Sequence, residues 1–143
     1  MSLPYIPAGH TIEYVPLENP FMQAARLVAE TESLDPDHAT GAVLVRADEI
    51  IGAGANGSNY HKQHGCARKA QNIPTGEGYE LCEGCHPKNH AEQTALANCA
   101  DPTNADCYLW GHWWCCQSCW NAMIQSGIKN VYLPEGAEKM FRK

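Results

Sequence analysis

The sequence predicts a single α/β domain in which helices pack around one sheet. Two observations lead to this prediction. After one helical segment and two apolar strand-like runs, helical and strand-like segments alternate to the end of the chain. Hydrophobic residues make up 44% of the 143 residues, which is enough for one core without disulfide bonds. We therefore expect residues 1–143 to form one domain.

The first half of the chain is expected to contain a helix and a hairpin. Residues 1–18 are rich in proline and are expected to be irregular. Asn19 and Pro20 are typical of an N-cap and a first helical residue, and the helix should end before Pro36. Short apolar runs rich in β-forming residues then predict two paired strands. They lie at 41–45 and 50–55.

The second half begins with a long polar segment, about 56–89, that is rich in glycine and contains cysteines. It has neither helical nor strand periodicity, and segments of this kind within compact domains are usually functional or held in place by something. Alternating helices and strands are expected after it. The expected helices are 90–100, 116–125 and the tail 135–143, and the expected strands are 107–110 and 130–133.

The net charge of −6 argues against a nucleic-acid partner, because an acidic chain has no general attraction for phosphate backbones. No apolar run approaches the ~20 residues that span a bilayer. The N-terminus also lacks the basic and apolar regions of a signal peptide. These features predict a cytoplasmic protein without a membrane partner.

Eight cysteines are expected to remain reduced in such a protein, and clustered reduced thiols more often bind metal than form bridges. Two pairs have C-x-x-C spacing, Cys82/Cys85 and Cys116/Cys119, and seven histidines accompany them. The composition therefore predicts a small zinc protein.

The most specific pattern is His90-Ala91-Glu92 at one expected helix start, with Cys116 and Cys119 at the next. One histidine and two thiolates supply the three protein ligands that a catalytic zinc ion requires, and the fourth position stays open for water. Glu92 can lie near the metal without binding it, where a carboxylate can take a proton from water and deliver it to a leaving amine. This is the H-x-E…C-x-x-C signature of zinc deaminases that act on nucleobases. In a purely structural zinc site, Glu92 would have no purpose.

Residues 41 to about 133 resemble the cytidine/deoxycytidylate deaminase superfamily and are most similar to its deoxycytidylate (dCMP) deaminase-like branch. The motifs that carry the resemblance are Gly41-Ala-Val, Gly54-Ala-Asn56-Gly57-Ser58 and His90-Ala-Glu-Gln. The resemblance implies a three-layer α-β-α sandwich with a central mixed sheet. It also implies zinc ligands at His90, Cys116 and Cys119, with Glu92 as the proton shuttle.

The resemblance further implies that Asn56 hydrogen-bonds the substrate near its sugar or base. Ala91 and Trp114 are also expected substrate contacts, and packing in the core is the alternative interpretation of Trp114. An ordinary Asn-Gly turn is the alternative interpretation of Asn56.

The sequence departs from the family pattern in three places. Cys115 stands where the family usually has proline, and it could compete for the metal or simply pack. Residues 111–114 are bulkier than the family's usual stretch, so the substrate could differ from an ordinary pyrimidine nucleotide. The chain ends soon after the fourth expected strand, so the family's fifth strand is expected to be missing or replaced by the tail.

A second metal cluster is predicted in the long polar segment. Three thiols and one histidine would form a closed tetrahedral set, and such a metal would supply folding free energy that this polar segment lacks. Some dCMP deaminase-like proteins carry a structural zinc ion in this insertion. The alternative is a lid with incidental thiols. The candidate ligands are Cys66, Cys82, Cys85 and His64, with His86 or His61 as alternatives to His64.

These features predict a Zn2+-dependent hydrolase that deaminates a cytosine-type nucleotide or nucleoside and releases ammonia. Two alternatives are a deaminase of another ring (a purine, a pterin-like base or a base in RNA) and a catalytically silent, zinc-stapled binding module. The expected substrate is a small nucleobase-containing molecule, and resemblance to the superfamily predicts a homo-oligomer, a dimer or larger.

Overall fold

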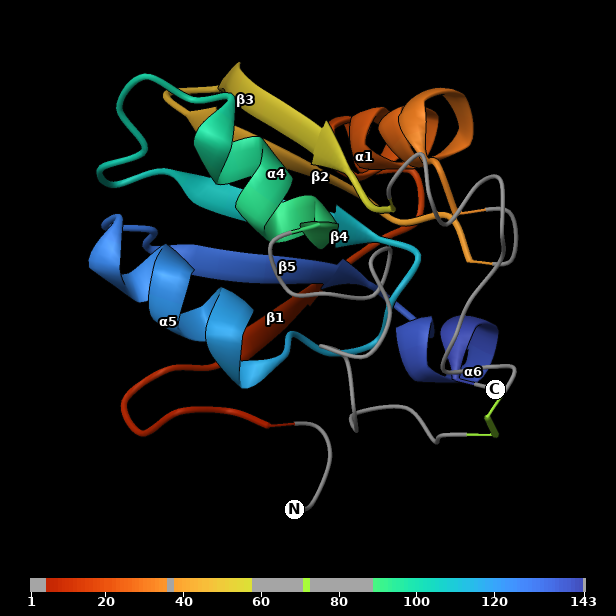
Figure 1. Ribbon diagram of the computed structural model, residues 1–143. Helices are drawn as coiled ribbons and strands as arrows, with labels where there is room; N and C mark the ends of the chain where they lie inside the picture. Colours follow the sequence, from red (N-terminus) through yellow and green to blue (C-terminus); the bar gives the residue numbers. More distant parts are fainter. Residues whose placement is uncertain (1–4, 36–37, 58–70, 73–88, 143) are drawn as a thin grey trace.

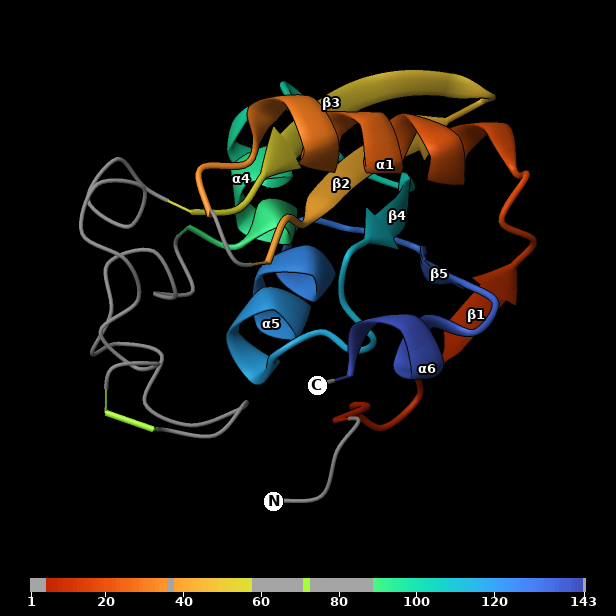
Figure 2. The same ribbon diagram turned by 90° about the vertical axis from the view of Figure 1, so that its right-hand side faces the viewer.

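The computed structural model describes residues 5–35, 38–57, 71–72 and 89–142. These residues form three layers, with one helix on one face of a sheet and two helices on the other (Figures 1 and 2). Helix α1 (Pro20–Glu32) covers the first face, and α4 (Ala91–Ala97) and α5 (Gln117–Gln125) cover the second. A short helix, α6 (Ala137–Phe141), follows the last strand. The predicted α-β-α sandwich is confirmed.

The sheet has five strands in the order β1-β5-β4-β2-β3. Strand β2 pairs antiparallel with β3 and β4, whereas β5 pairs parallel with β4 and β1. The predicted mixed sheet is therefore confirmed. The strands are β1 (Ile12–Val15), β2 (Gly41–Arg46), β3 (Glu49–Ala55), β4 (Asp106–Trp110) and β5 (Asn130–Pro134).

The fifth strand corrects two expectations. Residues 12–15 were expected to be irregular, and a fifth strand was expected to be missing or replaced by the C-terminal tail. Instead, β1 forms the edge of the sheet beside β5, with Ile12 opposite Val131. Ile12 is the one buried residue of this strand, so its four residues carry almost no periodic signal. The segment becomes a strand because it pairs with the edge of β5, and this pairing cannot be predicted from residues 12–15 alone.

The two sides of β2 contribute to two separate apolar clusters. Ala42 and Leu44 pack on the side of α4 and α5, whereas Val43 and Val45 pack on the side of α1. A strand that is covered on both faces is apolar along its length rather than alternating. This burial explains the continuous apolar run that predicted the strand.

Helix α1 approaches β2 so closely that only glycine fits at position 41. A Cβ atom there would lie 2.3 Å from the carbonyl oxygen of Ala25 and 2.5 Å from the backbone nitrogen of Ala29.

We expect Gly41→Ala to destabilise the fold by ~1–3 kcal/mol, because the added methyl group would force the backbone of α1 away from β2. Thermal unfolding measures this loss. Leu27→Ala is the control, since Leu27 is 61% exposed on the same helix, and an equal melting temperature for both variants would contradict the close approach.

The start of α1 follows the predicted capping chemistry. The side chain of Asn19 accepts hydrogen bonds from the backbone nitrogens of Phe21 (3.0 Å) and Met22 (3.1 Å). His90 and Cys116 are the N-caps of α4 and α5, two helices that pack against each other.

Among the described residues, no helix is long and apolar enough to cross a membrane.

Candidate functional site

Helices α4 and α5 bring the three predicted metal ligands together. The Nδ1 atom of His90 lies 3.4 Å from the Sγ atom of Cys116 and 3.4 Å from that of Cys119. The three ligand atoms lie within 4.8 Å of one another. Both helices begin at this point, so His90 meets two cysteines that follow it by 26 and 29 residues in the sequence.

The spacing of these atoms fits a zinc ion. Zinc–sulfur and zinc–nitrogen bonds of about 2.3 and 2.05 Å at a tetrahedral angle place nitrogen and sulfur roughly 3.5 Å apart. The observed distances of 3.4 Å agree with this value. With one nitrogen and two sulfur ligands, the site leaves one tetrahedral position for water or substrate, as catalytic zinc sites do.

The thiol of Cys116 is prepared for metal binding by its surroundings. Hydrogen bonds from the Cys119 side chain and from His90, together with the charge of His90, lower the pKa of Cys116. The backbone nitrogen of Cys119 also donates to the Cys116 Sγ, at 3.5 Å. A lowered pKa favours the thiolate, which is the form that binds metal.

Gln93 links the two helices beside the ligands. Its Nε2 atom donates to the Oγ of Ser118 at 3.1 Å and to the Sγ of Cys119 at 3.7 Å. Groups that hydrogen-bond metal ligands fix their orientation and tune their basicity. Gln93 therefore holds Cys119 in place from the neighbouring helix.

Glu92 lies in the first turn of α4 and is only 4% exposed. Burial raises the pKa of its carboxyl group, and His90 opposes part of this rise. A carboxyl group whose pKa is raised holds a proton more readily than an ordinary carboxyl group, which favours a role as a general acid/base. Glu92 is outside the group of potential metal ligands, as expected for a proton shuttle.

Cys115 packs in the hydrophobic core and is completely buried. Burial raises the pKa of its thiol, and the adjacent carboxyl group of Glu92 raises it further. The potential metal ligands are Cys116 and Cys119 and do not include Cys115. In this structure Cys115 therefore packs in the core and is not placed to compete for the metal.

Asn56 follows β3 and connects it to the chain beyond α1. Its Oδ1 atom accepts hydrogen bonds from the Oγ of Ser33 (2.6 Å) and the backbone nitrogen of Thr40 (2.8 Å). Its Nδ2 atom donates to the carbonyl oxygen of His38 at 2.8 Å. The next residue, Gly57, has a φ of 98°, in the left-handed region that favours glycine. Contact between Asn56 and a substrate stays a prediction.

Ala91 and Trp114, the other two expected substrate contacts, are both buried. Ala91 is the first residue of α4, next to His90, and Trp114 is two residues before Cys116. Their position beside the ligands fits the expectation, but contact with a substrate stays a prediction for both.

Sequence reasoning did not single out His112. Its ring lies 5.5 Å from the ring of His38 and 5.7 Å from that of Trp114. The only sequence feature that pointed to this segment was the bulk of residues 111–114. That feature could not reveal the environment of the His112 ring, because His38 approaches the segment from more than 70 residues away in the sequence.

The predicted second metal cluster lies outside the described residues. Its candidate ligands are Cys66, Cys82, Cys85, His64, His61 and His86. A second zinc ion therefore stays a prediction.

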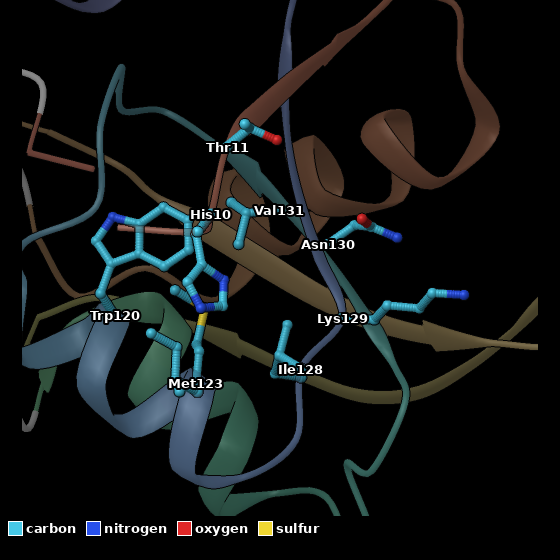
Figure 3. A pocket seen from close by; sticks show the side chains of 10 residues that line it. His10, Thr11, Trp120, Met123, Ile128, Lys129, Asn130 and Val131 are labelled. Atoms are coloured by element: carbon cyan, nitrogen blue, oxygen red, sulfur yellow. The ribbon is translucent and has the colours of Figure 1, made fainter. Parts of the chain in front are cut away.

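A cavity of about 100 Å³ lies between α5, the segment before β1 and the start of β5 (Figure 3). Its wall includes Trp120, whose ring is 5.9 Å from that of His10. The side chains of Lys129 and Asn130 extend away from these rings in Figure 3. The lining contains none of the metal ligands, so the cavity is not the candidate active site.

Residues 17–135 match the family model of the cytidine and deoxycytidylate deaminase zinc-binding region. The chain is 35% identical over 120 residues to ComE operon protein 2 of Bacillus subtilis, covering 80% of this chain and 57% of that protein. It is 31% identical over 118 residues to an uncharacterized deaminase in the luxG 3′ region of Aliivibrio fischeri, covering 82% of this chain and 72% of the other. The chain thus spans little more than half the length of the Bacillus subtilis protein.

The fold is similar to that of the dCMP deaminase from the cyanophage S-TIM5. Its apo structure gives a TM-score of 0.54 at 22% identity, covering 85% of this chain and 86% of that one. Its complex with dCMP and dUMP gives 0.54 at 23% identity, with 84% of each chain covered. From the family match and the ligand geometry together, we conclude that the chain belongs to the cytidine and deoxycytidylate deaminase zinc-binding family.

Proposed function

We propose that the protein hydrolyses the exocyclic C–N bond of a cytosine-type nucleotide or nucleoside and releases ammonia. The observation that carries this proposal is the convergence of His90, Cys116 and Cys119 within 4.8 Å, beside the buried carboxyl group of Glu92. A structural zinc site would have no use for such a carboxyl group, and burying one without a role is unfavourable.

Zinc held by these three ligands would lower the pKa of water toward neutrality, which is the chemistry that the metal supplies. Glu92 accepts a proton from the attacking water and passes it to the departing amino group. A C–O bond forms at the ring carbon, the C–N bond breaks, and the amine leaves as ammonia. The raised pKa of Glu92 suits both halves of this transfer, because the carboxyl group must gain and lose a proton in each turnover.

Two observations support a small cytosine-type substrate. The net charge of −6 favours a free molecule over a nucleic acid, which would require a cationic track. The similar cyanophage enzyme is a dCMP deaminase and was solved with dCMP and dUMP.

Ammonia release from a panel of amino-substituted bases tests this proposal. The panel contains dCMP, cytidine, cytosine, AMP, guanine and a pterin, each offered to the zinc-loaded protein. We expect the highest kcat/KM for a cytosine-type member. Activity confined to a purine or pterin would support the other-ring alternative, and no ammonia from any member would support a binding module.

We also propose that the native protein binds two zinc ions per chain, the second held by Cys66, Cys82, Cys85 and one histidine. Replacing both Cys82 and Cys85 by serine should lower the zinc content from two to one and reduce activity indirectly, because the segment loses its metal. Elemental analysis of purified protein measures the ratio. Cys99→Ser is the control, since this cysteine is outside the predicted clusters. One zinc per chain, unchanged by the double replacement, would rule out the second site.

A further proposal is that the protein forms a homo-oligomer. Large apolar side chains remain exposed on the single chain, including Tyr14 (54%) and Ile50 (47%). Burial of such surface between copies is favourable. Light scattering should give a mass at least twice 15.7 kDa. A mass near that of one chain at micromolar concentration would contradict the proposal.

A further inference from the structure

The segment that leads into Cys116 carries an imidazole and an indole ring, those of His112 and Trp114. The Nδ1 atom of His112 accepts hydrogen bonds from the backbone nitrogens of Trp113 (2.9 Å) and Trp114 (3.4 Å). A ring nitrogen that accepts carries no proton, so this network assigns the proton of the neutral ring to Nε2. His112 therefore presents a single N–H donor, on Nε2.

The His112 ring lies close to two other rings. The His38 ring is 5.5 Å away, and its Nε2 hydrogen-bonds the carbonyl oxygen of Gly111. Trp114 lies at 5.7 Å with its plane turned by 71°. Burial, together with the charges of His38 and His90, lowers the pKa of His112 to about 3. The ring is thus uncharged at neutral pH, and it lies on the segment that leads into Cys116, the N-cap of α5.

Trp114 supplies the second, independent observation. Its side chain is only 2% exposed, and its indole nitrogen has no hydrogen-bond partner among the described residues. Buried polar groups in folded proteins are nearly always hydrogen-bonded, so an unpaired donor needs an explanation. Trp120 shows the ordinary case, since it is equally buried and its Nε1 donates to the carbonyl oxygen of Tyr5 at 3.1 Å. An acceptor on a bound ligand would satisfy Trp114.

We propose that His112 and Trp114 determine specificity by donating two hydrogen bonds from uncharged N–H groups to a carbonyl oxygen of the substrate's base. A carbonyl oxygen has two lone pairs and can accept both bonds. The inference rests on the proposed function and deepens it. Such a pair selects rings that carry an oxo group beside the amidine, as cytosine does, over adenine, which has no carbonyl group. A site that hydrogen-bonds a substrate group rejects analogues without it, because its own donors are then left unpaired.

The indole N–H resonance of Trp114 gives a test that does not depend on turnover. In 15N-labelled, zinc-loaded protein, Trp114→Phe and Trp120→Phe assign the two indole signals. Saturation with dUMP should move the Trp114 N–H proton downfield and leave that of Trp120 in place, whereas inorganic phosphate should move neither. An unmoved Trp114 signal in protein that has bound dUMP would overturn the inference. Failure of both dUMP and dCMP to bind would count against the proposed function itself.

Substrate discrimination gives the matched kinetic test. Trp114→Phe removes the N–H but keeps an aromatic ring, and His112→Asn keeps an acceptor at the Nδ1 position but removes the Nε2 donor. Each should lower kcat/KM for dCMP about 5- to 10-fold, the effect of one lost hydrogen bond. His112→Gln, which keeps a donor near the Nε2 position, should lose less.

The same variants should change kcat/KM for the 2-thio analogue of dCMP much less, because sulfur accepts hydrogen bonds weakly. Equal losses on dCMP and its 2-thio analogue would mean that the two residues only support the fold, and would overturn the inference. In that result the native protein still deaminates dCMP, so the proposed function would stand.

Discussion

Replacing Glu92 by glutamine or alanine is expected to lower kcat by ~10²–10⁴-fold and to leave the metal content unchanged. Glu92 is not among the potential ligands, so its loss should not release zinc. Glutamine has nearly the same shape but cannot accept and return a proton. It is also uncharged, so the buried position should accept it without loss of the fold. Ammonia release and elemental zinc analysis on the same sample measure both quantities.

The matched control is Glu49→Gln, at an exposed position at the start of β3. It makes the same chemical change away from the site and should keep full activity. Full activity of the Glu92 variants on every accepted substrate would show that the deaminase mechanism is wrong. Loss of zinc from Glu92→Gln would instead make Glu92 a ligand or a necessary support of the metal.

Replacing Cys119 by alanine is expected to remove both the catalytic zinc ion and all detectable activity. In the part of the chain that the structure describes, the group has three protein ligands, and His90 and Cys116 alone would bind zinc far more weakly. The melting temperature should fall as well, because metal that binds only the folded state stabilises it. Zinc analysis, ammonia release and thermal unfolding should therefore change together.

Cys99→Ser is the control for this experiment, because Cys99 is partly buried but outside the ligand group. It removes a thiol while leaving the three ligands in place, so zinc content and activity should stay close to those of the native protein. A Cys119→Ala protein that keeps its full zinc content and turnover would show that the metal is bound elsewhere.

Helix starts that are visible in the local sequence made much of the fold and site predictable. Asn19 and Pro20 marked the start of α1. His90 and Cys116 marked the starts of α4 and α5, and both proved to be N-cap residues. Because the ligands lie at these helix starts, predicting the helices also placed the ligands.

Features that depend on distant partners could not be predicted in the same way. Residues 12–15 become a strand only because the edge of β5 is available to pair with them. The side chain of Asn56 is bound by residues near 33–40, which no turn signal in its own neighbourhood reveals. The environment of His112 likewise depends on His38. In each case the deciding contact joins segments that are far apart in sequence.

The central claim, hydrolytic deamination at this site, is tested most directly by turnover in water enriched in oxygen-18. Zinc-loaded protein acting on its best cytosine-type substrate should release one ammonia for each product molecule. That product should carry one solvent oxygen where the amino group was, as mass spectrometry of the base would show. A product without solvent oxygen, or no ammonia from protein with zinc at His90, Cys116 and Cys119, would contradict the claim.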